Sequence, residues 1–159
     1  MGMEEIKIRL IRHNELREAA KVYAKAFNNS NVGEEWTEES AFRLLNCLIK
    51  KQEDLSFIGE IVGGYFATIK PWWDGNHLTD AELFVNPSYQ KLGVGKKLCI
   101  KMYETALDKY KISIVEASTF KNKAFPLSWH KKVGFQESKD LILIDGNPKE
   151  ILKNLKDST

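Results

Sequence analysis

The feature that most constrains this chain is a turn with two glycines at residues 90–97, Gln-Lys-Leu-Gly-Val-Gly-Lys-Lys. A strand-like run over residues 81–85 precedes the turn, and a long helical repeat follows it. Gly93 and Gly95 carry no Cβ, so a ligand can come close to their backbone. The first N–H groups of a helix lack partners within the helix and form the positive end of its dipole. The turn therefore predicts an anion site, for which phosphate is the natural ligand.

Two common phosphate-binding motifs do not fit this turn. The dinucleotide motif G-x-G-x-x-G needs a third glycine where Leu98 stands. The P-loop motif G-x-x-x-x-G-K-[ST] needs a glycine where Gln90 stands and a serine or threonine where Lys97 stands. A dinucleotide site and an NTPase are therefore disfavoured. A strand-to-helix turn that packs closely and binds no ligand stays open as an alternative.

The remaining pattern, Gln-x-x-Gly-x-Gly after Leu83-Phe84-Val85, resembles the acyl-CoA pyrophosphate signature of the GNAT superfamily of N-acetyltransferases. Residues 86–89 and the amphipathic helix after the turn follow in the family's order. The resemblance implies acetyl-CoA as the cofactor, with the strand backbone pairing with its pantetheine arm as another strand would. It implies these cofactor-binding residues: Leu83, Phe84, Val85, Gln90, Lys91, Leu92, Gly93, Val94, Gly95, Lys96 and Asn122.

The size and composition of the chain suit one globular domain. A chain of 159 residues buries about two-thirds of the surface that its unfolded form exposes. No apolar run is long enough to span a bilayer, and residues 1–5 have neither the basic nor the apolar part of a secretory signal. We therefore expect a single N-acetyltransferase domain over residues 1–159, in the cytoplasm and without a membrane partner.

The charges and cysteines argue against two other classes of protein. The net charge of +2 gives no broad field that would attract nucleic acid, although Lys91, Lys96, Lys97 and Lys101 gather beside the turn. Two isolated cysteines and three histidines show no metal-ligand spacing, so we expect no metal site.

Hydrophobic periodicity predicts alternating strands and helices along the chain. Residues 71–76 are expected to form a loop, and Gly63-Gly64 a bulge. The family resemblance implies an α/β (α+β) fold with one mixed, twisted sheet of six to seven strands and helices on both faces. We expect strands near residues 6–11, 55–59, 60–69, 80–86, 112–117, 136–139 and 141–144, and helices near 14–27, 41–48, 93–109 and 126–132, with a terminal helical turn at 147–150.

Acetyl transfer to an amine needs a base, because an alkylammonium with a pKa of about 10 must first lose its proton. The family positions a glutamate near this strand, so the resemblance assigns the base to Glu82. An ordinary glutamate, with a pKa of about 4.3, is a weak base, so this role predicts partial burial and a raised pKa. A surface glutamate paired with lysine is the alternative. Asp80 competes for the role because a bulge would change which side chains face the cleft.

Residues 129–135, Trp-His-Lys-Lys-Val-Gly-Phe, are similar to a late family segment whose tyrosine protonates the leaving CoA thiolate. His130 stands at the tyrosine position, and an imidazole can donate a proton near neutral pH. Its alternative role is packing. If Gly134 is the left-handed residue after a helix, Phe135 should fold back over Trp129 and His130.

The acceptor site is expected where aromatic and acidic side chains gather, because both favour a cationic amine. One group precedes the second helix and another precedes the signature strand. An acidic helix start that complements the helix dipole is the alternative reading of the first group. The candidate substrate-binding residues are Trp36, Trp72, Trp73, Asp74 and Asp80.

The sequence thus predicts an N-acetyltransferase that moves acetyl from acetyl-CoA to a primary amine of a small molecule by direct attack in a ternary complex. The Trp36 and His130 regions loosely resemble bacterial aminoglycoside acetyltransferases. A non-catalytic module that binds or senses acyl-CoA is the alternative from another class, and protein amines are the alternative acceptors. A homodimer stays open as the oligomeric state.

Overall fold

A computed structural model describes residues 6–157, so the residues 1–5 considered for a signal lie outside the described part. Contacts divide the chain into two compact units, one up to Thr119 and one from Phe120 onward. None of the helices within residues 6–157 is long and apolar enough to cross a membrane.

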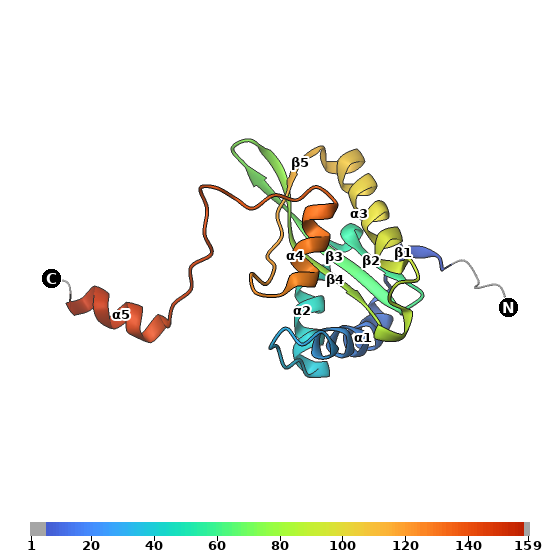
Figure 1. The fold of residues 1–159 in the computed structure, drawn as a ribbon, viewed down its shortest axis with the longest axis horizontal. Helices are drawn as coiled ribbons and strands as arrows, with labels where there is room; N and C mark the ends of the chain where they lie inside the picture. Colours follow the sequence, from blue (N-terminus) through green and yellow to red (C-terminus); the bar gives the residue numbers. More distant parts are fainter. Residues whose placement is uncertain (1–5, 158–159) are drawn as a thin grey trace. The chain divides into compact units, whose positions relative to one another are not determined.

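The first unit is built on a sheet of five strands in the order β1-β2-β3-β4-β5 (Figure 1). Neighbouring strands are antiparallel from β1 to β4, whereas β5 runs parallel to β4. The sheet is mixed, as predicted, but the predicted count of six to seven strands is wrong. The strands are β1 (Ile8–Leu10), β2 (Ser56–Gly59), β3 (Gly63–Trp72), β4 (Gly75–Val85) and β5 (Ile112–Val115).

Helices cover both faces of this sheet, as the sequence predicts. Tyr65 and Phe66 are neighbours on β3 and so point to opposite faces. Phe66 lies in the buried cluster with residues of α1 and α2, whereas the ring of Tyr65 contacts Tyr103 of α3. The helices of this unit are α1 (Leu16–Asn29), α2 (Glu38–Lys51) and α3 (Val94–Tyr110), with short 3-10 turns η1 (His13–Glu15), η2 (Glu53–Leu55) and η3 (Pro87–Tyr89).

Strands β3 and β4 form a long hairpin where a loop was expected. The ladder continues to the pair Trp72↔Gly75, so only Trp73 and Asp74 form the turn. The Pro-Trp-Trp sequence suggested a loop because proline weakens a strand, but Pro71 lies at the end of the ladder, where its missing N–H costs little. The predicted 71–76 loop is therefore wrong.

A β-bulge lies in β4 and not at Gly63-Gly64, which pair regularly with Val85 and Phe84. The register advances two residues on β3, from Phe66 to Thr68, while β4 advances three, from Glu82 back to Thr79. Asp80 takes up part of the extra length with a left-handed backbone, at a φ of 52°. The extra residue gives Glu82 and Thr79 the same face of the sheet.

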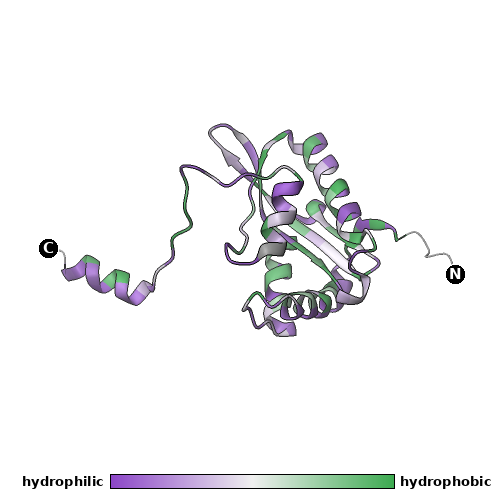
Figure 2. Cartoon of the chain, viewed as in Figure 1, coloured by the Kyte–Doolittle hydropathy of each residue, from purple (hydrophilic) through white to green (hydrophobic). Residues whose placement is uncertain are grey.

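The second unit contains α4 (Ala124–Lys132) and α5 (Pro148–Asp157). Residues 136–139 and 141–144 form no strands, so those two predictions are wrong. The side chains of residues 141–144, Leu-Ile-Leu-Ile, have the composition of a strand and are apolar in Figure 2, but they are at least 77% exposed. An apolar pattern becomes a strand only where a neighbour completes its hydrogen bonds. The helical turn predicted at 147–150 begins α5, and there the Asn147 side chain accepts the N–H of Lys149.

Candidate active site

The C-terminal half of β4 has one edge that no other strand of the described sheet pairs with. Strand β5 pairs with β4 only as far as Leu78↔Val115, followed by the N–H of Glu116 donating to the carbonyl of Leu78 at 2.9 Å. Beyond that point no strand within residues 6–157 pairs with this edge, while the opposite edge stays paired with β3 as far as Val85. Along residues 80–85, the main-chain N–H and C=O groups that do not pair with β3 are therefore available to an extended ligand.

The glycine turn leads from this strand into an uncapped helix. Gly93 occupies the N-cap of α3 with a φ of 84°, and no side chain caps the helix. The N–H groups of the first turn therefore lack helical partners. A Cβ on Gly95 would meet only Val85 Cγ2, at 3.7 Å, so the surface beside this residue is open. This geometry, with exposed Lys91 and Lys96 nearby in sequence, fits a diphosphate.

Several predicted cofactor residues have side chains engaged in the protein itself. Phe84 and Val94 are buried, at 3% and 2% exposure, so their side chains are not available to a ligand. The Gln90 side chain donates from Nε2 to the carbonyl of Val85 at 3.2 Å and so joins the turn to the strand. The side chains of Leu83 and Val85 are half-buried.

Glu82 lies on the same strand segment and is half-buried. Burial raises the pKa of its carboxyl, the negative charges of Glu34 and Asp80 raise it further, and a hydrogen bond from Tyr23 opposes the rise. The Tyr23 hydroxyl donates to Glu82 Oε2 at 2.8 Å. Glu82 therefore combines partial burial with a raised pKa, the two properties that a carboxylate base requires.

An aromatic cluster surrounds the Tyr23 ring. Its centroid lies 4.5 Å from that of Phe27, 5.0 Å from Trp36 and 5.2 Å from Phe84. The indole N–H of Trp36 donates to Glu34 Oε2 at 2.7 Å. Of the predicted substrate residues, Trp36 therefore lies close to Glu82. The sequence did not predict a role for Tyr23, because helical periodicity indicates only that it lies on the buried face of α1.

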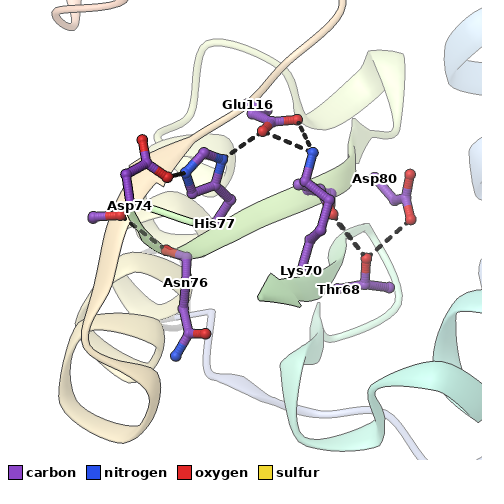
Figure 3. A network of polar contacts seen from close by, with 9 residues as sticks. Thr68, Lys70, Asp74, Asn76, His77, Asp80 and Glu116 are labelled. Atoms are coloured by element: carbon purple, nitrogen blue, oxygen red, sulfur yellow. Dashed lines mark hydrogen bonds and ion pairs between the residues drawn. The ribbon is translucent and has the colours of Figure 1, made fainter. Parts of the chain in front are cut away.

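A second polar network lies where β5 leaves β4 (Figure 3). His77 is 4% exposed, and its two ring nitrogens contact Glu116 Oε1 at 2.5 Å and Asp74 Oδ1 at 2.7 Å. Lys70 also contacts Glu116, at 2.9 Å. The hydrogen bond with Glu116 raises the pKa of His77 and lowers the pKa of Glu116. The network therefore binds a protonated imidazole between two carboxylates.

The structure does not bring the hairpin residues together with Glu82. Trp72, Trp73 and Asp74 lie at the tip of the β3–β4 hairpin, and Trp73 is 87% exposed. Glu82 lies seven residues beyond Gly75 on β4, about 23 Å at the usual rise of a strand. Asp80 is nearer to Glu82, and its carboxylate accepts the Thr68 hydroxyl at 2.9 Å (Figure 3).

His130 and Asn122 belong to the second unit. His130 Nδ1 donates to the carbonyl of Pro126 at 2.6 Å, which leaves Nε2 as the ring nitrogen available for chemistry. Gly134 has a φ of 109°, the Phe135 N–H donates to the His130 carbonyl, and the two rings lie 5.0 Å apart. The predicted contact of Phe135 with His130 at the helix end is therefore confirmed. Asn122 is exposed in the segment before α4.

The sequence profile of the Acetyltransferase (GNAT) family matches residues 14–135. The chain therefore belongs to the GNAT family of acetyltransferases, as its glycine turn predicts. Members of this family are acyltransferases that use acetyl-CoA. No curated protein sequence matches the chain.

Solved structures share this fold at low sequence identity. A "possible acetyltransferase" from Clostridium difficile 630 gives a TM-score of 0.71 at 17% identity, over 91% of this chain and 98% of that chain. A transcriptional regulator from Bacillus halodurans C-125 gives a TM-score of 0.67 at 17% identity, over 89% of this chain and 100% of that chain. A third structure is that of AAC(6')-Iy, an aminoglycoside N-acetyltransferase, in complex with the bisubstrate analogue CoA-S-monomethyl-acetylneamine. It gives a TM-score of 0.64 at 19% identity, over 91% of this chain and 99% of that chain. At such identities the likeness shows the fold alone.

Proposed function

We propose that this protein is an N-acetyltransferase that moves an acetyl group from acetyl-CoA to a primary amine of a small molecule. The observation that carries the proposal is the free edge of β4 beside the half-buried Glu82. This edge can hold an extended ligand next to a carboxylate of raised pKa. Direct attack of the amine requires that arrangement, and no covalent enzyme intermediate is needed.

The main chain of β4 and the start of α3 would hold the cofactor. Residues 83–85 pair with the pantetheine arm, and the N–H groups of the first turn of α3 bind the diphosphate. Lys91 and Lys96 add positive charge, and Asn122 is a further contact. When bound, the cofactor supplies an activated acetyl group as a thioester. An N–H near Val85 would polarise the thioester carbonyl, an effect worth about 3 kcal/mol for one such donor in other enzymes.

Glu82 acts as the base that takes the proton from the substrate ammonium. Its raised pKa brings it closer to that of the amine, which makes the proton transfer less unfavourable. Trp36 and Asp80 contact the acceptor amine from beside Glu82. The proton for the leaving thiolate comes from His130 through Nε2.

A small polycationic amine suits this end of the sheet. Glu34 and Asp80 are close enough to raise the pKa of Glu82, so a cation bound between them would be stabilised by three carboxylates. The fold of an aminoglycoside N-acetyltransferase is compatible with such a substrate. Trp72, Trp73 and Asp74 would contact only the far end of a long acceptor.

The chain would work as one N-acetyltransferase domain. The family profile runs from residue 14 to residue 135 and crosses the boundary between the two compact units at Thr119. The family's sequence pattern therefore continues into α4, which carries His130.

Thiol release from acetyl-CoA across a panel of amines tests this function. The panel contains aminoglycosides, polyamines, amino acids and a lysine peptide. We expect turnover with a small cationic amine, and a fall in kcat of about 10²–10⁴-fold in Glu82→Gln, with unchanged cofactor affinity. His130→Ala should lower kcat at saturating amine and also leave that affinity unchanged.

Binding measurements distinguish the alternative functions. Calorimetric binding of acetyl-CoA without turnover for any amine would favour the non-catalytic module. Turnover with the lysine peptide alone would favour a protein acceptor. Absence of coenzyme A binding to folded protein at millimolar concentration would contradict both the enzyme and the module.

A further inference from the structure

Tyr23 is a rigid hydrogen-bond donor beneath the proposed base. Its side chain is 1% exposed, and the rings of Phe27, Trp36 and Phe84 surround it. Trp36 is itself fixed by two main-chain hydrogen bonds with the Asn28 side chain, at 2.7 and 2.8 Å. The phenol cannot change its direction without displacing several packed rings.

The Tyr23 hydroxyl meets only one of the two carboxylate oxygens of Glu82. It donates to Oε2 at 2.8 Å, and within residues 6–157 no other group hydrogen-bonds the Glu82 side chain. Oε1 is therefore the oxygen that can accept a proton from a bound substrate. A carboxylate bound at one oxygen also loses rotation about its last side-chain bond.

We propose that Tyr23 is a positioning residue, which fixes Oε2 of Glu82 and so presents Oε1 to the substrate amine. The proposal rests on the proposed function, because it assigns Tyr23 a role in that reaction. It adds a residue of α1, outside the glycine turn and the signature strand, to the site.

The electrostatics of the pair support this role. Burial raises the pKa of Tyr23, and the adjacent charge of Glu82 raises it further, so the phenol keeps its proton wherever the enzyme works. A donor of this kind favours the ionised carboxylate, whereas burial favours the neutral one. Tyr23 thus opposes the rise in pKa that burial causes and favours the ionised form of Glu82, the form that can act as a base.

The test compares Tyr23→Phe with the wild-type protein in two measurements. The first is an NMR titration of the Glu82 carboxyl carbon in the cofactor-free protein, assigned with Glu82→Gln. The second is the pH profile of kcat/KM. Loss of one hydrogen bond to the carboxylate should raise the Glu82 pKa by about one unit and move the acidic limb upward equally. Activity below that limb should fall about tenfold.

Tyr65→Phe is the matched control. Tyr65 is also buried, at 4% exposure, but its hydroxyl pairs with Tyr103 at 3.1 Å on the other face of the sheet. This variant loses a buried hydroxyl but should change neither the Glu82 pKa nor the acidic limb of the kcat/KM profile. If Tyr23→Phe is poorly folded, replacement of Tyr23 alone by a fluorotyrosine of greater acidity serves instead, and should lower the Glu82 pKa.

The outcomes separate the positioning role from the proposed function. A Glu82 pKa that is the same in folded Tyr23→Phe and wild type would overturn the role, with or without turnover. The positioning role would also be overturned if the Glu82 pKa shifts in the NMR titration while the acidic limb of the kcat/KM profile stays where it is. A shifted titration in a protein that binds no coenzyme A would leave the Tyr23–Glu82 pair intact and contradict only the acetyltransferase.

Discussion

Gly64 lies against Phe84 across the β3–β4 ladder, so closely that a Cβ on Gly64 would fall 2.5 Å from Cζ of the ring. The Phe84 ring therefore covers a backbone that has no side chain of its own. The same ring contacts Tyr23, which holds Glu82. The absence of a side chain at residue 64 thus allows the packing that positions the proposed base.

Gly64→Ala should destabilise the protein by about 1–3 kcal/mol, because the added methyl group overpacks a core that cannot expand freely. The displaced Phe84 ring should also disturb Tyr23 and lower kcat. Urea unfolding measures the first effect and steady-state kinetics the second. An unchanged unfolding midpoint would show that the ring moves aside at little cost.

Gly95→Ala should have the opposite effect on stability. The new Cβ meets only Val85 Cγ2 at 3.7 Å, and alanine favours a helix over glycine, so we expect a gain of about 0.5 kcal/mol. The methyl group would stand where the diphosphate approaches the first turn of α3. Calorimetry should then show coenzyme A binding at least about tenfold weaker, or about 1.4 kcal/mol. Unchanged affinity would place the diphosphate elsewhere.

His77→Gln should remove a pH-dependent contribution to stability. The pKa of His77 is raised above 6.5 in the folded state, so its contribution is full below pH 6.5 and is lost as the pH rises through the folded pKa. The pKa of Glu116 is lowered from 4.5, so its contribution is lost as the pH falls below that value. Urea unfolding should show a larger cost of His77→Gln at pH 6 than at pH 9. An equal cost at both would contradict a charged imidazole.

Glu15→Gln should lower the stability of the protein at neutral pH and cost less in acid. Arg9 binds Glu15 through two hydrogen bonds, at 2.6 and 2.8 Å, and lowers the pKa of that carboxyl to about 2. The contribution is therefore present above pH 4.5 and lost between 4.5 and about 2. Arg9 is 38% exposed, so solvent screening limits the loss at pH 7 to about 1 kcal/mol.

Glu18→Gln is the control for this prediction. Glu18 pairs with Lys21 on the exposed face of α1 at 3.2 Å, and such a pair is worth about 0.2–0.5 kcal/mol. Thermal unfolding at pH 7 and pH 2.5 should show that the cost of Glu15→Gln shrinks in acid. A cost that is equal at both values would mean that the Arg9 pair contributes through packing alone.

The sequence predicts those parts of the fold that depend on local chemistry. Thr37 caps α2 by accepting the N–H of Ser40 at 3.0 Å, and this contact lies within one turn of helix. The glycine turn before α3 is specified in the same way, by residues that tolerate its backbone. Apolar alternation located the first five strands, since each has a partner elsewhere in the chain.

Features that depend on distant partners could not be predicted. The Tyr23–Glu82 hydrogen bond joins residues 59 apart in sequence, and the Lys70–Glu116 contact joins residues 46 apart. Residues 141–144 have the sequence of a strand, but no strand within residues 6–157 pairs with them. The sequence suggested a bulge in this strand, but the alternation of side chains alone does not show at which residue the bulge lies.

The bulge in β4 has a consequence for how this protein can vary. Thr79 and Glu82 are three positions apart, which would put them on opposite faces of a regular strand, and they still share one face because Asp80 and Ala81 together stand opposite Ala67. Deleting either of those two residues would turn the carboxylate of Glu82 toward α3, away from Tyr23. The left-handed backbone of Asp80 restricts which amino acids can stand there, and an insertion or deletion at these two positions would move the carboxylate to the wrong side of the sheet.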